Sequence, residues 1–206
     1  MSWRNQIRTC PTGPHGWLEG TVGSGETGIE LSGNLLVGGR DRAGGDLPTR
    51  STVVWSGGLG SSAFDAHPGT WLPRGWKALM EASQDAPAGT LVRPHAAHVI
   101  SDGLACRRFL EQPEAAHLGL AFSPASMLTE AMLSDRQDHL TRLFEMVAAE
   151  ASLILLEDLA QGRPCVAGRG SLNGGQIARL LDLHAPVDVR VVVAADADEA
   201  ALRWLQ

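Results

Sequence analysis

Beyond about residue 90 the sequence alternates between short apolar runs and amphipathic stretches, and this alternation limits the possible folds more than any other feature. Four apolar runs are predicted to form β-strands, at residues 91–92, 117–122, 152–156 and 187–195. The stretches after them have helical spacing and are predicted as helices, at residues 104–110 with Asp102 as the N-terminal cap, from Asp135 or Asp138 onward, at 174–183 and at 196–205. The segment 162–170 is predicted as a loop. Four strand–helix units predict an α/β fold with a parallel sheet, either open and doubly wound or closed as a (β/α) barrel.

The first 90 residues have a different character. Seventeen of the 24 glycines lie in the first 100 residues, and only brief strands are predicted there, at residues 6–10, 28–31 and 51–55. One amphipathic helix is predicted over residues 72–83. We therefore expect a single domain over residues 1–206, with a Gly-rich irregular part at 1–90 and regular strand–helix units at 91–206.

Composition excludes several classes of protein. With 44% apolar and 19% charged residues the chain is expected to be globular, and a net charge of −6 without basic runs argues against nucleic-acid binding. The cysteines Cys10, Cys106 and Cys165 are too few and too far apart for a disulfide framework or a cysteine-rich metal site. Neither a signal peptide nor a membrane span is recognisable, so we expect a cytoplasmic protein. Lys77 is the single lysine and lies in the predicted helix, which argues against Schiff-base chemistry.

Two features of the first half allow alternative interpretations. The Gly-rich turn at residues 57–62 resembles an anion-binding nest, but it lacks the Lys-Ser/Thr of a P-loop, and we favour a flexible strand-end turn. The tryptophans of this half either pack a thin core, which we favour, or line a site: Trp3, Trp17, Trp55, Trp71 and Trp76. Four histidines without partner spacing are predicted to lie at the surface: His67, His117, His139 and His184.

The second half resembles a known family. The segments that carry the resemblance are Leu-Val-Arg-Pro-His-Ala-Ala-His at 91–98, Leu-Gly-Leu-Ala-Phe-Ser-Pro-Ala-Ser-Met-Leu at 118–128, Leu-Ile-Leu-Leu-Glu-Asp at 153–158 and Gly-Arg-Gly-Ser-Leu at 168–172. In order and spacing they are similar to the xylose isomerase-like TIM barrels, the sugar and sugar-phosphate isomerase/epimerase superfamily. The resemblance covers roughly residues 90–206. It implies a (β/α) TIM-type barrel, reduced or irregular in its N-terminal part, and an isomerase or epimerase that uses Mn, Mg or Zn.

The chain departs from the family where the metal would bind. Arg93 stands where the resemblance implies Glu, Ser123 where it implies Asp, and Ser126 and Leu155 where it implies His. The last strand offers Ala-Ala at 194–195 instead of Glu. A guanidinium and a leucine cannot bind a metal ion, so we expect that the metal ligands are not retained and predict no cofactor. Asp158 and the two glycines of the Gly-Arg-Gly segment do match the family pattern.

Two functions compete after these departures. In the first, the chain is an isomerase or epimerase of sugars or sugar phosphates, which would use His95, His98, Glu157 and Asp158 as catalytic residues. In the second, it is a non-catalytic barrel that binds a carbohydrate-like ligand or acts as a scaffold. Arg93, Ser123 and Ser126 are the candidate substrate-binding residues in either case. A homodimer is possible if the trimmed barrel leaves a strand edge uncovered.

Several of these residues have a structural interpretation as well. His95 and His98 are either a pair that works at one point or loop residues bonded to the backbone. Successive residues of a strand point to opposite sides, so only one of Glu157 and Asp158 is expected to face the site. Arg93 is either a fork for an anionic ligand or the partner of Asp158 or Glu157 in an ion pair that fills the lost metal site.

Overall fold

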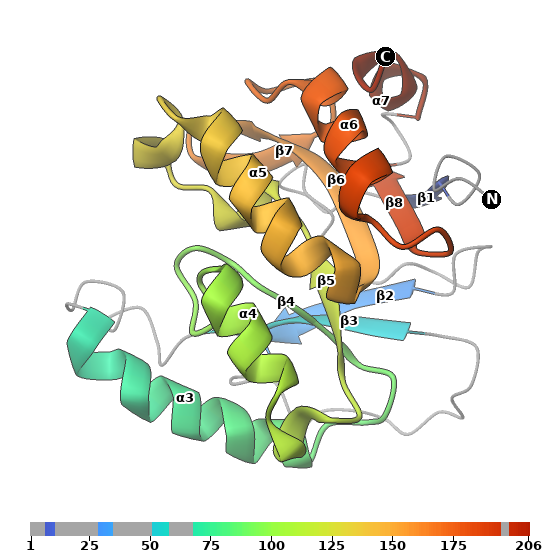
Figure 1. Ribbon diagram of the computed structural model, residues 1–206. Helices are drawn as coiled ribbons and strands as arrows, with labels where there is room; N and C mark the ends of the chain where they lie inside the picture. The colour runs from blue at the N-terminus through green and yellow to red at the C-terminus, as the bar shows by residue number, and fades with distance from the viewer. Residues whose placement is uncertain (1–6, 11–28, 35–50, 58–67, 195–197) are drawn as a thin grey trace.

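The computed structural model describes residues 7–10, 29–34, 51–57, 68–194 and 198–206, and the strands in these ranges build a parallel sheet (Figure 1). The strands are β1 (Ile7–Cys10), β2 (Ile29–Asn34), β3 (Ser51–Trp55), β4 (Leu91–Arg93), β5 (Gly119–Phe122), β6 (Ala151–Ala160), β7 (Arg163–Val166) and β8 (Arg190–Ala194). The helices are α3 (Pro68–Gln84), α4 (Gly103–Leu110), α5 (Arg136–Val147), α6 (Gly174–His184) and α7 (Asp198–Trp204). Short 3-10 turns lie at Pro113–Ala115, Ala125–Met127, Glu130–Met132 and Ala148–Glu150.

The strand order follows the chain, which confirms the predicted parallel α/β architecture. Neighbouring strands run β1-β8-β6-β5-β4-β3-β2 and every pair along this path is parallel. The connections between the parallel neighbours β4 and β5, β5 and β6, and β6 and β8 each contain a helix, as a parallel crossover requires. The strand pairs of the described residues do not include one between β1 and β2, which would close the sheet. Closure into a barrel therefore stays a prediction.

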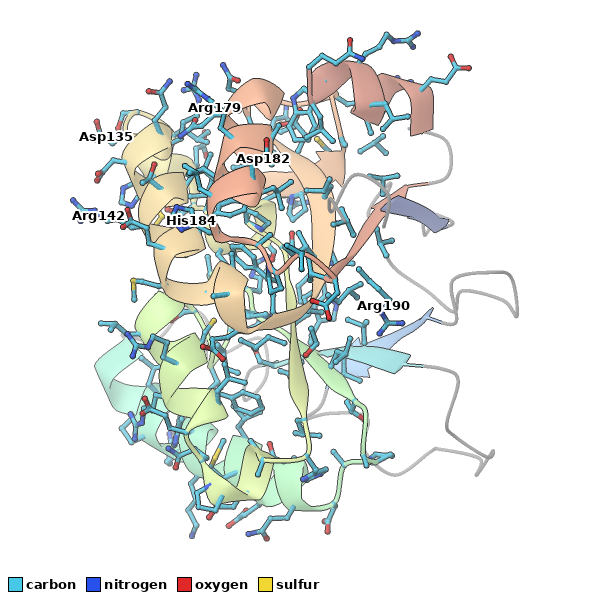
Figure 2. All side chains as sticks on the ribbon, turned by 45° about the vertical axis from the view of Figure 1, so that its right-hand side comes forward. Asp135, Arg142, Arg179, Asp182, His184 and Arg190 are labelled. Atoms are coloured by element: carbon cyan, nitrogen blue, oxygen red, sulfur yellow. The ribbon has the colours of Figure 1, made fainter. Side chains whose placement is uncertain are left out.

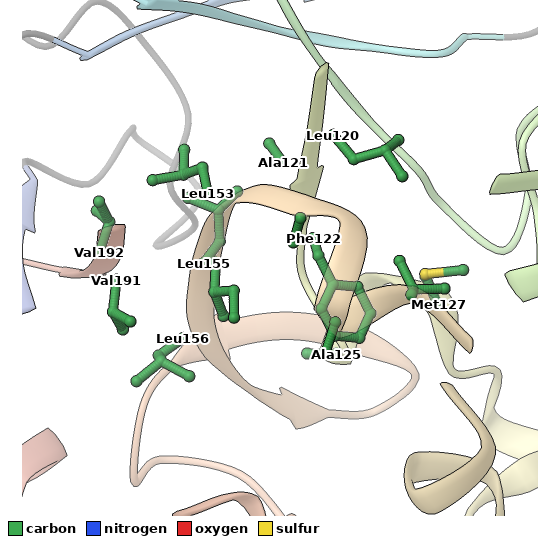
Figure 3. Close-up of a cluster of buried hydrophobic side chains, with 14 of the residues drawn as sticks. Leu120, Ala121, Phe122, Ala125, Met127, Leu153, Leu155, Leu156, Val191 and Val192 are labelled. Carbon is green, nitrogen blue, oxygen red and sulfur yellow. The ribbon is translucent and has the colours of Figure 1, made fainter. Parts of the chain in front are cut away.

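The core lies where the sheet meets its helices. Strand β6 is the most deeply buried, with Leu153, Ile154 and Leu155 fully enclosed, as expected of a strand covered on both faces. Figure 3 shows Leu153 and Leu155 between labelled side chains of β5 and β8. The rings of Phe122 on β5 and Phe144 on α5 meet edge to face with centroids 5.3 Å apart. This packing orients the carboxyl ends of β5 and β6, where the site residues lie.

Helices α4, α5 and α6 lie side by side along the outside of the sheet (Figure 1). Asp102 begins α4 by accepting a hydrogen bond from the Ala105 amide at 2.8 Å, as its sequence position predicts. Asp135 and Arg142 of α5 lie on the outer side of the molecule (Figure 2). The helices thus present one apolar and one charged face. In the described residues no helix has the length and apolar character needed to cross a bilayer.

One predicted loop contains a strand. The segment 162–170 includes β7, which pairs antiparallel with the end of β6 and extends that strand to Ala160. A two-residue turn joins the strands, with Gln161 at φ 51° and Gly162 at φ 70°, a backbone conformation that hairpin turns require. The loop prediction was wrong for residues 163–166. The apolar run ends at Glu157 and Asp158, which suggested the end of the strand, but both side chains are buried inside β6.

The start of α6 provides a test of the packing between α6 and α7. A Cβ on Gly174 would lie 1.9 Å from the backbone oxygen of Trp204, whereas a Cβ on Gly175 would meet only Asn173 Oδ1, at 3.4 Å. We expect Gly174→Ala to lower the melting temperature by at least about 4 °C, because α7 must move. Gly175→Ala adds a helix former without a clash and is expected to keep or raise it. Equal melting temperatures in heat denaturation would contradict this packing.

Candidate functional site

The predicted site residues come from the carboxyl ends of adjacent strands. Trp55 ends β3, and Arg93 is its register partner at the end of β4. Ser123 follows the last residue of β5, and Glu157 lies on the next strand, β6. Because these strands are parallel and adjacent, their carboxyl ends meet at one edge of the sheet, which is where ligands bind in parallel α/β folds.

A buried ion pair forms the centre of this edge. Arg93 Nη2 donates to Glu157 Oε2, and the Ser123 hydroxyl donates to the same oxygen at 2.6 Å. The exposed fractions of Arg93, Ser123 and Glu157 are 1%, 0% and 3%. The guanidinium carbon lies 4.0 Å from the centre of the Trp55 ring, so the cation also stacks on an aromatic face. Of the two partners that the sequence allowed for Arg93, the structure pairs it with Glu157.

Asp158 points away from this cluster. Its Oδ1 accepts hydrogen bonds from the amides of Leu159 and Leu172 at 2.7 and 2.8 Å, and its Oδ2 accepts one from Gly170 at 2.7 Å. A Cβ on Gly170 would lie 2.4 Å from the Leu159 oxygen, so the backbone approaches the carboxylate closely only because this residue is glycine. Adjacent residues of β6 therefore face opposite ways, as expected, and Asp158 fixes the segment after β7.

His95 and His98 lie together in the loop after β4. Their ring centroids are 4.8 Å apart, and each lies 5.4 Å from the Trp55 ring in an edge-to-face arrangement. His95 Nδ1 accepts a hydrogen bond from the Ala97 amide at 3.1 Å, and His98 Nδ1 accepts one from the Gly57 amide at 3.2 Å. Both side chains are half-buried. The loop thus places two imidazoles beside the buried ion pair. The predicted hydrogen bond to the backbone is present in both histidines, and it uses Nδ1 of each ring.

The surroundings keep both imidazoles neutral. The pKa of His95 is lowered to about 4, mainly by burial and then by the Arg93 guanidinium, while Glu157 acts in the opposite direction. The pKa of His98 is lowered to about 3 by burial, by His95 and by Arg93. On β7, the pKa of Cys165 is raised to about 11 by burial and by the carboxylates of Asp158 and Glu157. At neutral pH this edge thus holds neutral imidazoles and a protonated thiol, which argues against a cysteine nucleophile.

A pH-dependent stability follows from the two histidines. Because their pKa values in the folded protein lie below the ordinary value of about 6.5, the unfolded chain binds more protons over the range from about pH 6.5 to about 4. Stability should fall as the pH falls through that range, by about 2 kcal/mol per histidine between about pH 8 and pH 5. Urea denaturation of the wild type and of the double variant His95→Asn/His98→Asn measures this difference. Identical pH profiles would contradict it.

Ser126 connects two loops of the site. Its hydroxyl lies 2.9 Å from the carbonyl oxygens of both Pro94 and Ser123 and donates to them, and its own carbonyl accepts a hydrogen bond from the Ala96 amide at 2.9 Å. Ser126 is buried, with 1% of its surface exposed. Ser126 therefore holds the loop that carries His95 and His98 against the loop after β5. Its position gives no direct support to the predicted contact with a substrate.

The residues of this edge do not fit a divalent cation. Leu155 is fully buried in the core, and Glu157, the carboxylate nearest the histidines, is paired with a guanidinium. The Nδ1 lone pairs of His95 and His98 already accept hydrogen bonds. Within the described residues, no group of three or more His, Cys, Asp or Glu side chains could hold a metal ion.

Trp55 has the role that the sequence offered only as the less favoured alternative. Core packing was the favoured interpretation of the tryptophans, yet this one contacts Arg93, His95 and His98. Its place directly before the Gly57 turn is the signal that could have identified it. Trp76 instead packs against the core beside Arg108. Trp3, Trp17, His67 and residues 58–62 of the proposed nest lie outside the described residues, as does the side chain of Trp71.

Comparison with known proteins gives little further guidance. No family model matches the chain, and no curated protein matches it. Among solved structures the chain is similar to the crystal structure of protein SMc04130 from Sinorhizobium meliloti 1021, with a TM-score of 0.44 and 15% sequence identity. The similarity covers 76% of this chain and 58% of the other, so it spans little more than half of that protein. The likeness is too weak to show a family.

Proposed function

We propose that the chain is a non-catalytic binding protein, which holds an uncharged, carbohydrate-like small molecule at the carboxyl ends of β3 to β6 without a metal ion. The observation that carries this proposal is the buried Arg93–Glu157 pair. The pair places the fixed positive charge of Arg93 where the resemblance implies a metal-binding residue. This charge balances the negative charge of Glu157.

The engagement of the predicted catalytic carboxylates supports binding over catalysis. Glu157 accepts hydrogen bonds from Arg93 and Ser123 on one oxygen, and Asp158 accepts three from backbone amides. Each would have to break such bonds to move a substrate proton, and a general base needs free access to the proton that it removes. The isomerase or epimerase function implied by the resemblance is therefore the weaker candidate.

The charges and rings of the site favour an uncharged ligand. The Arg93 and Glu157 charges offset each other, and both imidazoles are neutral, so these four described side chains supply no excess positive charge to attract a phosphate. Neutral hydrogen-bonding groups beside aromatic rings suit a molecule with hydroxyl groups and apolar C–H faces, such as a sugar. This supports the carbohydrate-like ligand predicted from the sequence.

Three further predictions from the sequence belong to this proposal: the closed barrel, the cytoplasmic location and the homodimer. The strand order and the β1–β8 pairing support closure of the sheet into a (β/α) barrel of the xylose isomerase-like type. A cytoplasmic location and a homodimer stay predictions of the sequence.

Proton NMR in deuterated water tests binding and catalysis together. The protein is mixed in turn with D-glucose, D-xylose, D-fructose and D-glucose 6-phosphate, and saturation transfer reports binding. We expect transfer to at least one neutral sugar, weaker transfer to the phosphate, and no change in the sugar signals over a day. His139→Asn, a change on α5, which contributes none of the site residues, is the control and should bind like the wild type.

Two outcomes of this experiment would overturn the proposal. Deuterium incorporated next to the sugar carbonyl, or new product signals, would identify an isomerase or epimerase, because proton transfer at that carbon exchanges the hydrogen with solvent and either reaction forms a different sugar. The absence of saturation transfer to every sugar would instead show that the site does not bind carbohydrates.

A further inference from the structure

The hydrogen bonds of the two histidines determine which ring nitrogen carries the proton. A backbone amide can only donate, so a nitrogen that accepts from one must present a lone pair. In both His95 and His98 that nitrogen is Nδ1, bonded to the amides of Ala97 and Gly57. A neutral imidazole has one N–H, which must then lie on Nε2. The lowered pKa values of both rings mean that the neutral form is the one present at pH 7.

The two hydrogen bonds differ in what they connect. The bond to His95 comes from Ala97, two residues away in the same loop, so it fixes the ring within its own turn. The bond to His98 comes from Gly57, two residues after the end of β3, and the Val99 amide donates back to the Gly57 carbonyl at 3.0 Å. His98 thereby joins the ends of β3 and β4 and positions the loop that carries His95.

The other polar side chains of the site are less available to a ligand. Arg93, Ser123, Ser126 and Glu157 are each at most 3% exposed and bonded to one another or to the backbone. His95 is half-buried, and its Nδ1 is already engaged, so Nε2–H is its remaining polar group. Among the described residues, the site thus offers a hydrogen-bond donor from a neutral, half-buried ring.

We propose that His95 recognises the ligand as a hydrogen-bond donor through Nε2–H, so that the ligand atom beside it is an acceptor oxygen of a carbonyl, ether or hydroxyl group. His98 is a positioning residue that holds the loop. This inference rests on the proposed binding function and names the group that recognises the ligand. It also excludes His95 as a metal ligand or a proton acceptor in this tautomer, because both uses need a lone pair on Nε2.

Imidazole ¹⁵N NMR of the full-length protein at pH 7 tests the tautomer without any ligand. The two-bond spectrum distinguishes a protonated from an unprotonated ring nitrogen, and His95→Asn and His98→Asn assign the signals. We expect Nε2 to carry the proton in both rings. A proton on Nδ1 of His95, or a positively charged ring, would overturn the donor assignment even if a sugar binds.

A matched pair of variants tests the donor in binding. In His95→Asn the amide oxygen can replace Nδ1 as acceptor for Ala97, but nothing replaces Nε2–H. In His95→Gln the longer amide can place an N–H near the position of Nε2. We expect His95→Asn to weaken binding of the sugar with the strongest saturation transfer by about tenfold, and His95→Gln to stay within about threefold of the wild type.

The outcomes separate the two proposals. Equal binding by wild type and His95→Asn would overturn the role of His95 while leaving the binding function intact, and so would loss of binding in His95→Gln but not in His95→Asn. If no sugar binds the wild type, the proposed function fails, and the NMR spectrum still decides the tautomer. Melting temperatures within about 3 °C of the wild type would show that both variants fold.

Discussion

Replacing Arg93 by methionine is expected to lower the free energy of unfolding by about 3 to 5 kcal/mol, because the Glu157 carboxylate stays buried after its guanidinium partner is removed. The Ser123 hydroxyl still donates to that carboxylate, but a neutral hydroxyl does not offset its charge. Urea denaturation followed by circular dichroism measures the loss. The packing of the guanidinium on Trp55 adds to it.

The double variant Arg93→Met/Glu157→Met separates the charge from the packing. Removing both charges should recover most of the loss, since apolar residues of similar size often replace a buried ion pair at little cost. We expect the double variant to be more stable than Arg93→Met. Glu157→Met completes the cycle. If the losses of the single variants Arg93→Met and Glu157→Met simply added in the double variant, the two side chains would have no coupling, which would contradict the buried ion pair.

Asp158→Asn is expected to cost about 2 to 4 kcal/mol of stability, although the two side chains have nearly the same shape. The asparagine oxygen can still accept from Leu159 and Leu172, but its NH₂ group would face the Gly170 amide, donor against donor. Urea denaturation measures the change. Exchange of the Gly170 amide with deuterium should become faster, because its acceptor is lost.

A surface change of the same kind is the control for this variant. Asp138→Asn on α5 disturbs an exposed ion pair with Arg142, whose nitrogen lies 2.9 Å from the carboxylate. Exposed pairs contribute little, so we expect a change below about 0.5 kcal/mol. Should Asp158→Asn be no more harmful than Asp138→Asn, Asp158 would not fix the segment after β7.

Much of the fold could be predicted because hydrophobic spacing dominates it. The four strand–helix units after residue 90 and the capping of α4 by Asp102 agree with the structure. The strand β7 was missed for a physical reason. Glu157 and Asp158 are charged residues inside a buried strand, and their partners come from distant segments that no local pattern reveals.

The site could be predicted only in part. Alternation along a strand correctly put Glu157 and Asp158 on opposite sides, and Arg93 was expected to pair with one of them. The choice of partner, the role of Trp55 and the tautomer of His95 depend on which groups the fold brings together. The family pattern that the sequence resembles has metal ligands at the strand ends, whereas the residues found there in this chain do not fit a divalent cation, and for this reason we propose a metal-free binding site.

Metal titration of the wild-type protein tests that central claim most directly. The protein is purified without chelator, its metal content is measured, and its melting temperature is followed as Mn²⁺, Co²⁺ or Zn²⁺ is added. We predict no stoichiometric metal and no rise in melting temperature. Glu157 is already paired with Arg93, and Nδ1 of His95 and of His98 already accepts a backbone hydrogen bond. A stoichiometric metal, with a rise in melting temperature that His95→Asn/His98→Asn abolishes, would contradict the account.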